Sequence, residues 1–385
     1  MKILVTGAKG FVGKNLCAEL KNIRDGKDKS FGNLNINELF EFDIDTDPAL
    51  LDGYCRKSDF VFNLAGVNRP KDPGEFTAGN VGFAGTLLDI LKKHRNTCPV
   101  MISSSVQATL NNPYGQSKKA GEELLFKYSK DTGAKVLVYR FPNLFGKWCR
   151  PNYNSAVATF CYNIARDLPV TISNRENQLS LVYIGDLVTE MIAALKGEEH
   201  RDEDYCYVPE VYTATLGQIA DLLHSFREGR KTLEVPDLGD AFTKKLYAAY
   251  LSFLPEEDFS YPLKMNTDER GSFTEIIRTP DRGQFSVNIS KPYIAKGNHW
   301  HHTKTEKFIV VSGRGIIRFR KMDDPDAKII EYSVSGDKME VVDIPPGYTH
   351  NIENLGETDM VTFMWANEAF DPEKPDTYFE EMGGS

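Results

Sequence analysis

The sequence lacks any apolar run approaching the ~20 residues that a membrane span requires, and it lacks an excess of positive charge. Its 385 residues carry a formal net charge of −9, which argues against nucleic acid or an anionic membrane as the main partner. The apolar run at residues 2–6 predicts a strand, and a strand so early leaves no room for a signal peptide. We therefore expect a cytoplasmic protein without a nucleic-acid or membrane partner.

Cysteine is also scarce, and its spacing shows no pairs. This pattern excludes a disulfide framework and a cysteine-based metal motif, and it favours reduced thiols in a bacterial-type cytosol. Since all of the cysteines lie in the first 206 residues, none can serve a metal site formed by the rear of the chain alone. The six are Cys17, Cys55, Cys98, Cys149, Cys161 and Cys206.

The length and patterning predict two domains. A chain of 385 residues exceeds one ordinary core, and 41% hydrophobic with 26% charged residues is typical of a globular protein. Strand and helix patterns alternate up to about residue 255, and short β runs with frequent turns follow. We predict an α/β, Rossmann-type doubly wound parallel sheet over 1–258 and an all-β barrel over 259–385.

Particular elements can be predicted within these two parts. In the first, the clearest are a helix over 113–132 and strands over 59–66 and 100–105. In the second, residues 307–311 and 315–320 are predicted strands, and the turn between them predicts a hairpin. Another strand is expected over 339–344.

A glycine-rich turn follows the first strand. Gly7, Gly10 and Gly13 have the spacing of a dinucleotide fingerprint, in which glycine permits a tight turn, close approach to a pyrophosphate and close helix packing. A plain tight turn is the alternative, and the strand–turn–helix context disfavours it. The candidate cofactor-binding residues of this turn are Gly7, Lys9, Gly10, Phe11, Val12 and Gly13.

Two residues bear on which nicotinamide cofactor binds. Asp43 follows the second strand, where a carboxylate can accept hydrogen bonds from the adenosine ribose and would favour NADH. Lys9 could instead bind the 2′-phosphate of NADPH. A solvated loop acid is an equally good interpretation of Asp43, so the choice stays open.

Tyr114 and Lys118 are the candidate proton-transfer pair. Asn112 can cap a helix that starts at Pro113, and the i,i+4 spacing puts Tyr114 and Lys118 on one face. A neighbouring ammonium, together with the positive charge of an oxidised nicotinamide, would lower the pKa of the phenol from its usual ~10. Ser105, at the end of the preceding strand, is the serine chosen to hold the substrate oxygen. A tyrosine and a lysine at this spacing also occur on surface helices, but the ordered set of motifs favours catalysis.

Over roughly residues 1–255 the chain resembles the extended short-chain dehydrogenase/reductases, which act on nucleotide-linked sugars. Ala65 and Gly66, at the end of the predicted strand over 59–66, complete the segment Asn63-Leu64-Ala65-Gly66 and are further candidate cofactor-binding residues. Asn80 resembles the helix-start asparagine of that family. Asn143, in the segment Arg140–Gly146, resembles the asparagine that touches substrate. The resemblance implies Ser105, Tyr114 and Lys118 as catalytic residues.

The rear of the chain concentrates histidine. Four of the seven histidines lie between residues 299 and 350. His299 and His301 would share one face of a strand, Glu306 follows a short turn, and the turn at residues 345–349 could return His350 beside them. These ligands suit zinc, iron, manganese or nickel. A polar strand end is the alternative for His299 and His301 alone.

The complete rear pattern resembles the two cupin motifs, with Gly313 and Asn354 at their matching positions. The segment Asp268–Phe273 and residues 296–299 also resemble the cupin epimerases of deoxysugar pathways. Those enzymes remove a proton beside a ketone. A polarising metal makes such a proton acidic. Tyr348 and His302 are candidates for the base, although the ring of His302 is expected to face away from the metal.

The two parts in this order resemble a family of bifunctional capsular-polysaccharide enzymes of the UDP-N-acetyl-L-fucosamine pathway. That resemblance implies zinc, NADPH and a homodimer. It implies a UDP-linked keto-deoxy-N-acetylhexosamine that is epimerised at carbon 3 and then reduced at carbon 4 to UDP-2-acetamido-2,6-dideoxy-L-talose. Three other functions are compatible with the residues. They are a single-function reductase with a structural cupin, a nicotinamide sensor (which the retained Tyr114 and Lys118 disfavour) and an iron-dependent cupin dioxygenase.

Overall fold

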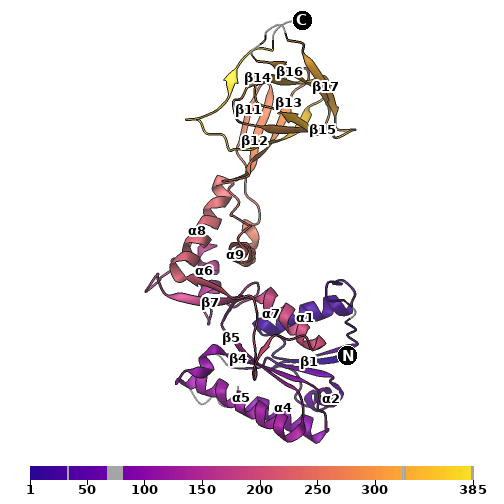
Figure 1. The fold of residues 1–385 in the computed structure, drawn as a ribbon, viewed down its shortest axis with the longest axis vertical. Helices are drawn as coiled ribbons and strands as arrows, with labels where there is room; N and C mark the ends of the chain where they lie inside the picture. The colour runs from indigo at the N-terminus through magenta and orange to yellow at the C-terminus, as the bar shows by residue number, and fades with distance from the viewer. Residues whose placement is uncertain (33, 67–80, 323, 325–326, 383–385) are drawn as a thin grey trace. The chain divides into compact units, whose positions relative to one another are not determined.

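The computed structural model describes residues 1–32, 34–66, 81–322, 324 and 327–382. The chain divides into two compact units (Figure 1). Met1–His224 and Lys245–Pro255 make up the first unit, and Ser225–Lys244 and Glu256–Ser385 make up the second.

The first unit is built around a seven-stranded sheet with the strand order β2-β1-β3-β4-β5-β9-β8. Its neighbouring strands are parallel except for the pair β8 and β9. A three-stranded sheet of order β10-β7-β6 lies in the same unit. The strands are β1 (Lys2–Thr6), β2 (Glu38–Phe42), β3 (Phe60–Asn63), β4 (Val100–Ser105), β5 (Val136–Phe141), β6 (Asn143–Phe145), β7 (Gln178–Tyr183), β8 (Arg201–Asp202), β9 (Tyr205–Cys206) and β10 (Tyr212–Thr215).

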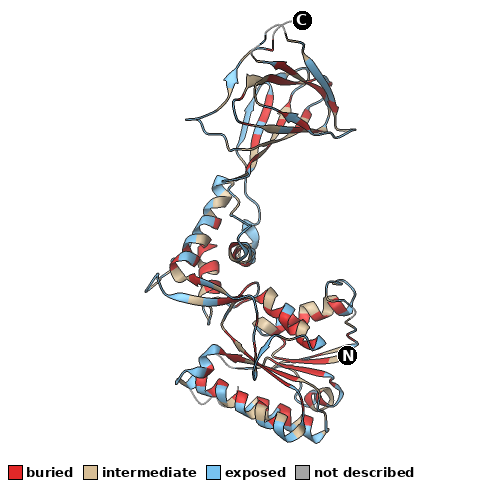
Figure 2. Ribbon diagram, viewed as in Figure 1, coloured by how far each residue is buried: buried red, intermediate tan, exposed pale blue. Residues whose placement is uncertain are grey.

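Helices cover both faces of the large sheet because its strands are apolar on both sides. In β1, Ile3 and Val5 join a cluster with α1 and α7, whereas Leu4 joins a cluster with α2, α4 and α5. Figure 2 shows these strands as buried. The described α-helices are α1 (Phe11–Arg24), α2 (Leu50–Lys57), α4 (Phe83–Lys93), α5 (Pro113–Thr132), α6 (Ala156–Ile164), α7 (Ile184–Lys196), α8 (Leu216–Thr232) and α9 (Ala241–Leu251).

The order of the strands creates a switch point between β1 and β3. From β1 the chain forms β2 on one side, and it then returns to form β3 on the other side of β1. Ligands of open α/β sheets bind beyond the carboxyl ends of the strands at such a point. The glycine turn after β1 and residues 64–66 after β3 both lie there. The sequence predicts a strand over 59–66, but β3 ends at Asn63, so residues 64–66 follow the strand rather than belong to it.

Helix α5 has the predicted bounds, and its ends show why. The Asn112 side chain accepts a hydrogen bond from Gly115 N–H at 2.8 Å, Pro113 occupies the first turn, and Gly133 ends the helix with a φ of 73°. An N-cap, an N1 proline and a C′ glycine are the three strongest local boundary signals. No described helix is both long and apolar enough to cross a membrane.

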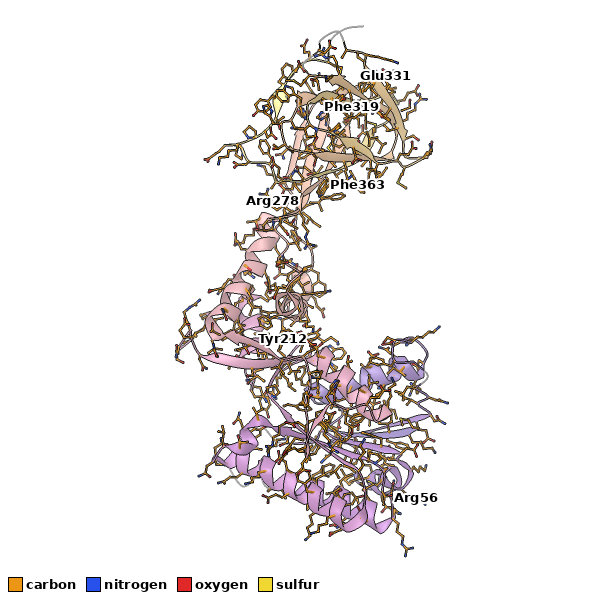
Figure 3. The ribbon with its side chains drawn as sticks, in the orientation of Figure 1. Arg56, Tyr212, Arg278, Phe319, Glu331 and Phe363 are labelled. Atoms are coloured by element: carbon orange, nitrogen blue, oxygen red, sulfur yellow. The ribbon has the colours of Figure 1, made fainter. Side chains whose placement is uncertain are left out.

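The second unit consists mainly of two antiparallel sheets with the orders β11-β12-β13-β20-β15-β18 and β17-β16-β19-β14-β21. Phe319, labelled in Figure 3, belongs to the apolar core of this unit. The strands are β11 (Met265–Asp268), β12 (Gly271–Thr279), β13 (Gly283–Ser290), β14 (Ala295–Trp300), β15 (Glu306–Ser312), β16 (Arg314–Lys321), β17 (Ile330–Ser335), β18 (Val342–Ile344), β19 (Tyr348–Asn354), β20 (Met360–Ala366) and β21 (Tyr378–Phe379). The parallel sheet and this all-β barrel confirm the predicted fold class.

The predicted hairpin between β15 and β16 is wrong. The two strands lie in different sheets, so the turn at Gly313 carries the chain from one sheet to the other. Gly313 has a φ of 82°, and a Cβ there would lie 3.0 Å from Met360 Cα. Strand β16 forms its hairpin with β17 instead. The strand expected over 339–344 also begins later, at Val342.

Candidate functional site

The glycine turn places the start of α1 at the end of β1. Gly7 has a φ of 66°, and a Cβ there would lie 2.7 Å from Ala65 N. A Cβ on Gly13 would overlap the carbonyl oxygen of Gly7. Gly10 caps α1 through its backbone, with no side-chain cap. This leaves backbone N–H groups and the positive end of the helix dipole facing the turn, an arrangement that suits phosphate.

Asp43 braces this turn. Its Oδ2 accepts a hydrogen bond from Lys9 N–H at 2.7 Å, and its Oδ1 accepts one from Ile44 N–H at 2.8 Å. The Lys9 ammonium forms an ion pair with Asp45, whose hydrogen bond raises the pKa of Lys9. Both residues that bear on the cofactor therefore have intramolecular partners, and their arrangement does not choose between NADH and NADPH.

The remaining cofactor candidates surround the same turn. Phe11 and Val12 start α1 and are partly buried against the core. Ala65 N–H donates to Thr6 Oγ1 at 3.4 Å, and Gly66 is exposed. Asn80 lies outside the described residues.

Ser105, Tyr114 and Lys118 lie together at the carboxyl end of β4. The Ser105 hydroxyl is hydrogen-bonded to the Tyr114 phenol. Lys118 Nζ is 5.7 Å from the centre of the Tyr114 ring and donates to Ser103 O at 3.0 Å. The short helical turn Val106–Thr109 lets the chain return within the short interval between Ser105 and Tyr114.

Burial shifts the two titrating groups in opposite directions. It raises the pKa of Tyr114, and the hydrogen bond from Ser105 opposes the rise. It lowers the pKa of Lys118 to about 8, and the Glu122 carboxylate opposes that fall. The Tyr114–Lys118 spacing predicts a lowered phenol pKa, but in the structure burial has the largest effect and raises it. Tyr114 therefore stays protonated at neutral pH and can act as an acid.

Behind Lys118, the buried Glu122 carboxylate pairs with the partly buried Arg140 guanidinium, and the sequence had not indicated this pair. Arg140 Nε and Nη2 donate to the two Glu122 oxygens at 2.9 and 2.6 Å, and Ser104 Oγ donates at 2.5 Å. Glu122 is one turn beyond Lys118 on the same face of α5. Continuing the i,i+4 series past Lys118 would have found it.

Asn143 is the first residue of β6 and is exposed. Its side-chain amide donates to Ser180 O at 3.1 Å.

In the second unit, the structure brings the four predicted metal-binding residues together. One ligand atom from each of them lies within 4.8 Å of the others. His299 on β14 is opposite His350 on β19. His301 follows β14, and Glu306 is the first residue of β15, so three strands converge on the cluster.

The protonation states of His299 and Glu306 favour metal binding. Burial, followed by the neighbouring His350, lowers the pKa of His299 to about 4. Burial would lower the pKa of His301 as well, but its contact with the Glu306 carboxylate raises it. Burial alone would raise the pKa of Glu306, but His301 and His350 hold it well below its usual range. His350 Nε2 is buried, lies 3.4 Å from Glu306 Oε2 and makes no well-formed hydrogen bond among the described residues. An ionised carboxylate, a neutral imidazole and an unsatisfied buried nitrogen fit a divalent transition metal such as zinc.

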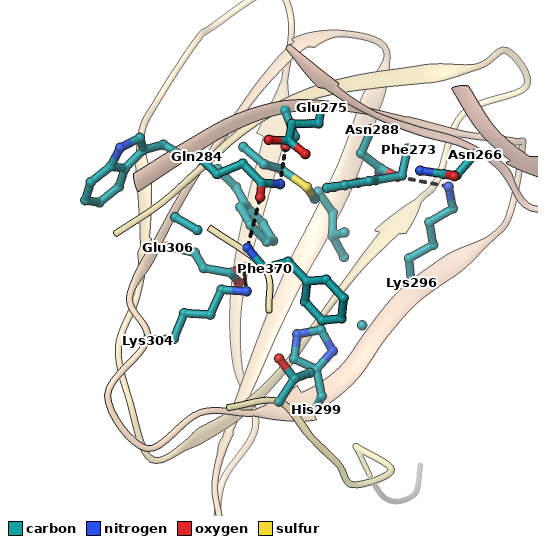
Figure 4. A pocket seen from close by; sticks show the side chains of 18 of the residues that line it. Asn266, Phe273, Glu275, Gln284, Asn288, Lys296, His299, Lys304, Glu306 and Phe370 are labelled. Carbon is teal, nitrogen blue, oxygen red and sulfur yellow. Dashed lines mark hydrogen bonds and ion pairs between the residues drawn. The ribbon is translucent and has the colours of Figure 1, made fainter. Parts of the chain in front are cut away.

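The cluster opens into a cavity of about 610 Å³ within the second unit (Figure 4). Gln284, Ser286 and Asn288 line it from β13, and Lys296 Nζ donates to Asn288 Oδ1 at 2.9 Å. Uncharged polar side chains on β13 and charged ones such as Arg278 and Lys296 make this a cavity for a ligand with many hydrogen-bonding groups.

The two residues suggested as the base do not line this cavity among the described residues. The His302 ring is exposed and packs against Trp300 and Tyr378 at centroid distances of 4.6 and 5.1 Å. Tyr348 packs against the apolar core. Lys304, which the sequence analysis did not select, does line the cavity, and its Nζ is 3.8 Å from Glu306 Oε1. The position of Lys304 between His301 and Glu306 in the sequence could have indicated that it lies near the cavity.

Two known families match parts of the chain. The NAD dependent epimerase/dehydratase family matches residues 3–207, and the polysaccharide biosynthesis C-terminal domain matches residues 266–378.

Individual relatives extend over the whole length. The chain is 43% identical over 383 residues to UDP-2-acetamido-2,6-beta-L-arabino-hexul-4-ose reductase from Pseudomonas aeruginosa, covering 100% of this chain and 99% of the relative. The capsular polysaccharide assembling protein CapF from Staphylococcus aureus aligns with a TM-score of 0.91 at 54% identity, covering 99% of this chain and 100% of that one. UDP-glucuronic acid 4-epimerase from Bacillus cereus, at 18% identity, has a TM-score of 0.53 over 66% of this chain and shares the fold of the first unit.

These similarities confirm the resemblances inferred from the sequence. Since the first family match spans more than half of the residues and the Pseudomonas relative is similar from end to end, the chain belongs to the NAD dependent epimerase/dehydratase family.

Proposed function

We propose that the chain is a bifunctional nucleotide-sugar enzyme. The cupin domain epimerises carbon 3 of a UDP-2-acetamido-2,6-dideoxy-4-keto-hexose. The reductase domain then reduces the 4-keto group with NADPH to UDP-2-acetamido-2,6-dideoxy-L-talose, for capsular polysaccharide. The observation that carries this proposal is that one chain holds both a Ser105–Tyr114–Lys118 cluster and a four-residue metal-ligand cluster.

In the reductase domain, taken as residues 1–258, Ser105 would hold the ketone oxygen and Tyr114 would donate a proton to it. The glycine turn after β1 would hold a reduced nicotinamide dinucleotide, which would supply the hydride for carbon 4. Lys118 holds a positive charge beside the phenol and is anchored by Ser103 O at 3.0 Å. The raised pKa of Tyr114 supports this direction of reaction, because the reduction needs the phenol rather than the phenolate.

In the epimerase domain, taken as residues 259–385, His299, His301, Glu306 and His350 would hold zinc. A metal at this site would polarise the ketone and acidify the proton on carbon 3. The polar wall from β13 would orient the sugar. A base from the cavity wall must remove the proton and return one to the other face.

The order of the steps follows from the chemistry. Epimerisation at carbon 3 needs the ketone at carbon 4, and reduction removes that ketone, so the metal site must act first. The Pseudomonas relative is named as a reductase of a hexul-4-ose, and the Staphylococcus relative as a protein of capsular polysaccharide assembly. Family membership implies a nicotinamide cofactor. A cytoplasmic homodimer is part of the same proposal.

Proton NMR of the UDP-4-keto sugar in deuterated buffer, without nicotinamide, tests the first step. Enzyme with zinc should introduce deuterium at carbon 3 faster than the spontaneous rate. Added NADPH should then be oxidised as the L-talo product forms. Oxidation of NADPH without any enhancement of exchange would leave a reductase that carries a structural cupin.

A further inference from the structure

The C-terminal part of the second unit lies along the residues that carry two of the four proposed ligands. We call residues 301–306 the ligand segment and residues 367–380 the C-terminal strap. Strand β21 of the strap pairs with β14, so that Phe379 is opposite His299. The strap therefore adjoins the metal-ligand cluster directly.

Asp376 of the strap holds the irregular part of the ligand segment through its carboxylate. Oδ1 accepts from His302 N–H at 2.9 Å. Oδ2 accepts from the N–H groups of Thr303 and Lys304 at 2.9 Å each, and from Thr303 Oγ1 at 3.0 Å. One carboxylate thus satisfies three consecutive backbone donors and a hydroxyl.

The same residue orients a proposed ligand through its backbone. His301 Nδ1–H donates to Asp376 O at 2.6 Å. Because a carbonyl can only accept, this bond keeps a proton of His301 on Nδ1, so that Nε2, which lies 3.4 Å from Glu306 Oε2, is the nitrogen that would bind a metal. Asp376 has a φ of 34°, a region that residues other than glycine rarely adopt. The surrounding hydrogen bonds maintain that conformation.

Asn367, at the other end of the strap, holds the next residue. Its Oδ1 accepts from Thr305 N–H at 3.0 Å, and its own N–H donates to Thr305 O at 3.0 Å. The N–H groups of residues 302–305 are therefore all bonded to two side chains of the strap. From His301 to Glu306, hydrogen bonds to the strap rather than pairing in a sheet determine the backbone path of the ligand segment.

We propose that Asp376 is a positioning residue of the metal site, which fixes the tautomer of His301 and the path from His301 to Glu306. This inference rests on the metal site of the proposed function. Groups that orient metal ligands typically change metal affinity about 10- to 100-fold when they are removed.

The test is metal binding by the full-length protein, measured as competition for Zn²⁺ with a chromophoric chelator and as the visible absorption spectrum of the Co²⁺ form. We expect Asp376→Ala to bind Zn²⁺ about 10- to 100-fold more weakly and to change the Co²⁺ spectrum at saturation. Asp376→Asn keeps the shape of the side chain and one acceptor oxygen, so its Zn²⁺ affinity should lie between those of the wild type and Asp376→Ala. Hydrogen exchange should accelerate at the amides of residues 302–304 and not in β13 or β20.

Two controls separate positioning from general destabilisation. Asp371→Ala removes another strap carboxylate, whose hydrogen bond among the described residues is a local one from Glu373 N–H at 2.9 Å. This variant should bind metal as the wild type does. Val334→Ala removes a buried core side chain on β17 and should lower the melting temperature without changing the Co²⁺ spectrum. The inference would be overturned if Asp376→Ala and Val334→Ala lost the same amount of Zn²⁺ affinity. It would also be overturned if Asp376→Ala bound Zn²⁺ with wild-type affinity. Failure of the wild type itself to bind metal would overturn the metal site of the proposed function.

Discussion

At the scale of single residues, the state of Tyr114 is decided by two opposing effects, burial and the hydrogen bond with Ser105. Burial is the larger effect, so the phenol is a proton donor before any cofactor binds. Lys118, one turn away on α5, is the sequence signal that indicates Tyr114. The pKa of Tyr114, however, depends on desolvation that no local sequence pattern reveals.

Tyr114→Phe tests the assignment of the acid. The variant should lose about 10²–10⁴-fold of the rate of NADPH oxidation, the usual contribution of general acid catalysis. It should keep deuterium exchange at carbon 3, because the metal cluster lies in the other unit. Stopped-flow absorbance and NMR measure the two reactions, and reduction at the wild-type rate would show that another group is the acid.

Lys118 is a buried cation whose pKa of about 8 lies below its value in an unfolded chain. Between pH 8 and ~10.4 the unfolded state therefore binds more protons than the folded state, and this group makes the protein more stable as the pH rises. Below pH 8 the penalty for burying the charge is fully present.

Lys118→Met should remove this pH dependence. The difference in unfolding free energy between Lys118→Met and the wild type should shrink by on the order of 2 kcal/mol from pH 7 to pH 10. Urea unfolding at several pH values measures it, and Lys119→Met, at the neighbouring position outside the catalytic cluster, is the matched control. A constant difference would mean that Lys118 keeps an ordinary pKa.

At the scale of elements, sequence signals predicted the helices better than the sheet pairing. The ends of α5 follow from Asn112, Pro113 and Gly133, whose effects are local. The pairing of β15 does not follow from its turn, because Gly313 permits a hairpin and a crossover between sheets equally well. The apolar contacts of β15 and β16 in the assembled barrel decide between them.

The glycine turn gives a prediction at this scale. Gly13→Ala should lower stability by about 1–3 kcal/mol through overpacking and weaken nicotinamide binding, because its Cβ would overlap Gly7 O. Gly53→Ala, in α2 with open space around it, should raise stability by up to ~1 kcal/mol. Urea unfolding and NADPH fluorescence titration measure both, and unaltered cofactor binding by Gly13→Ala would contradict the close packing of the turn.

At the scale of the whole molecule, the two candidate sites belong to different units of the chain. The metal-ligand cluster is formed entirely by residues of the second unit, and Ser105, Tyr114 and Lys118 by residues of the first. Each step of the proposed reaction therefore has its own set of side chains.

This separation predicts complementation. Tyr114→Phe and His350→Ala should each fail to make the L-talo product alone, and a mixture of the two proteins should make it after a lag, as the epimerised ketone diffuses between them. NMR time courses with NADPH measure the product, and His302→Ala should behave as the wild type because its ring faces away from the cluster. No product from the mixture would show that the ketone passes within one assembly.

The sequence by itself determined the features that depend on short spacing. The glycine turn, the helical Tyr114–Lys118 pair and the alternating His299 and His301 each follow from the period of one element, and together they indicated both folds. Only the tertiary structure decided which strand-end serine meets Tyr114, that Asp43 braces the glycine turn, and that Asp376 holds the ligand segment. Each of these depends on hydrogen bonds between segments far apart in the chain, which form only when the sheets and the barrel have closed.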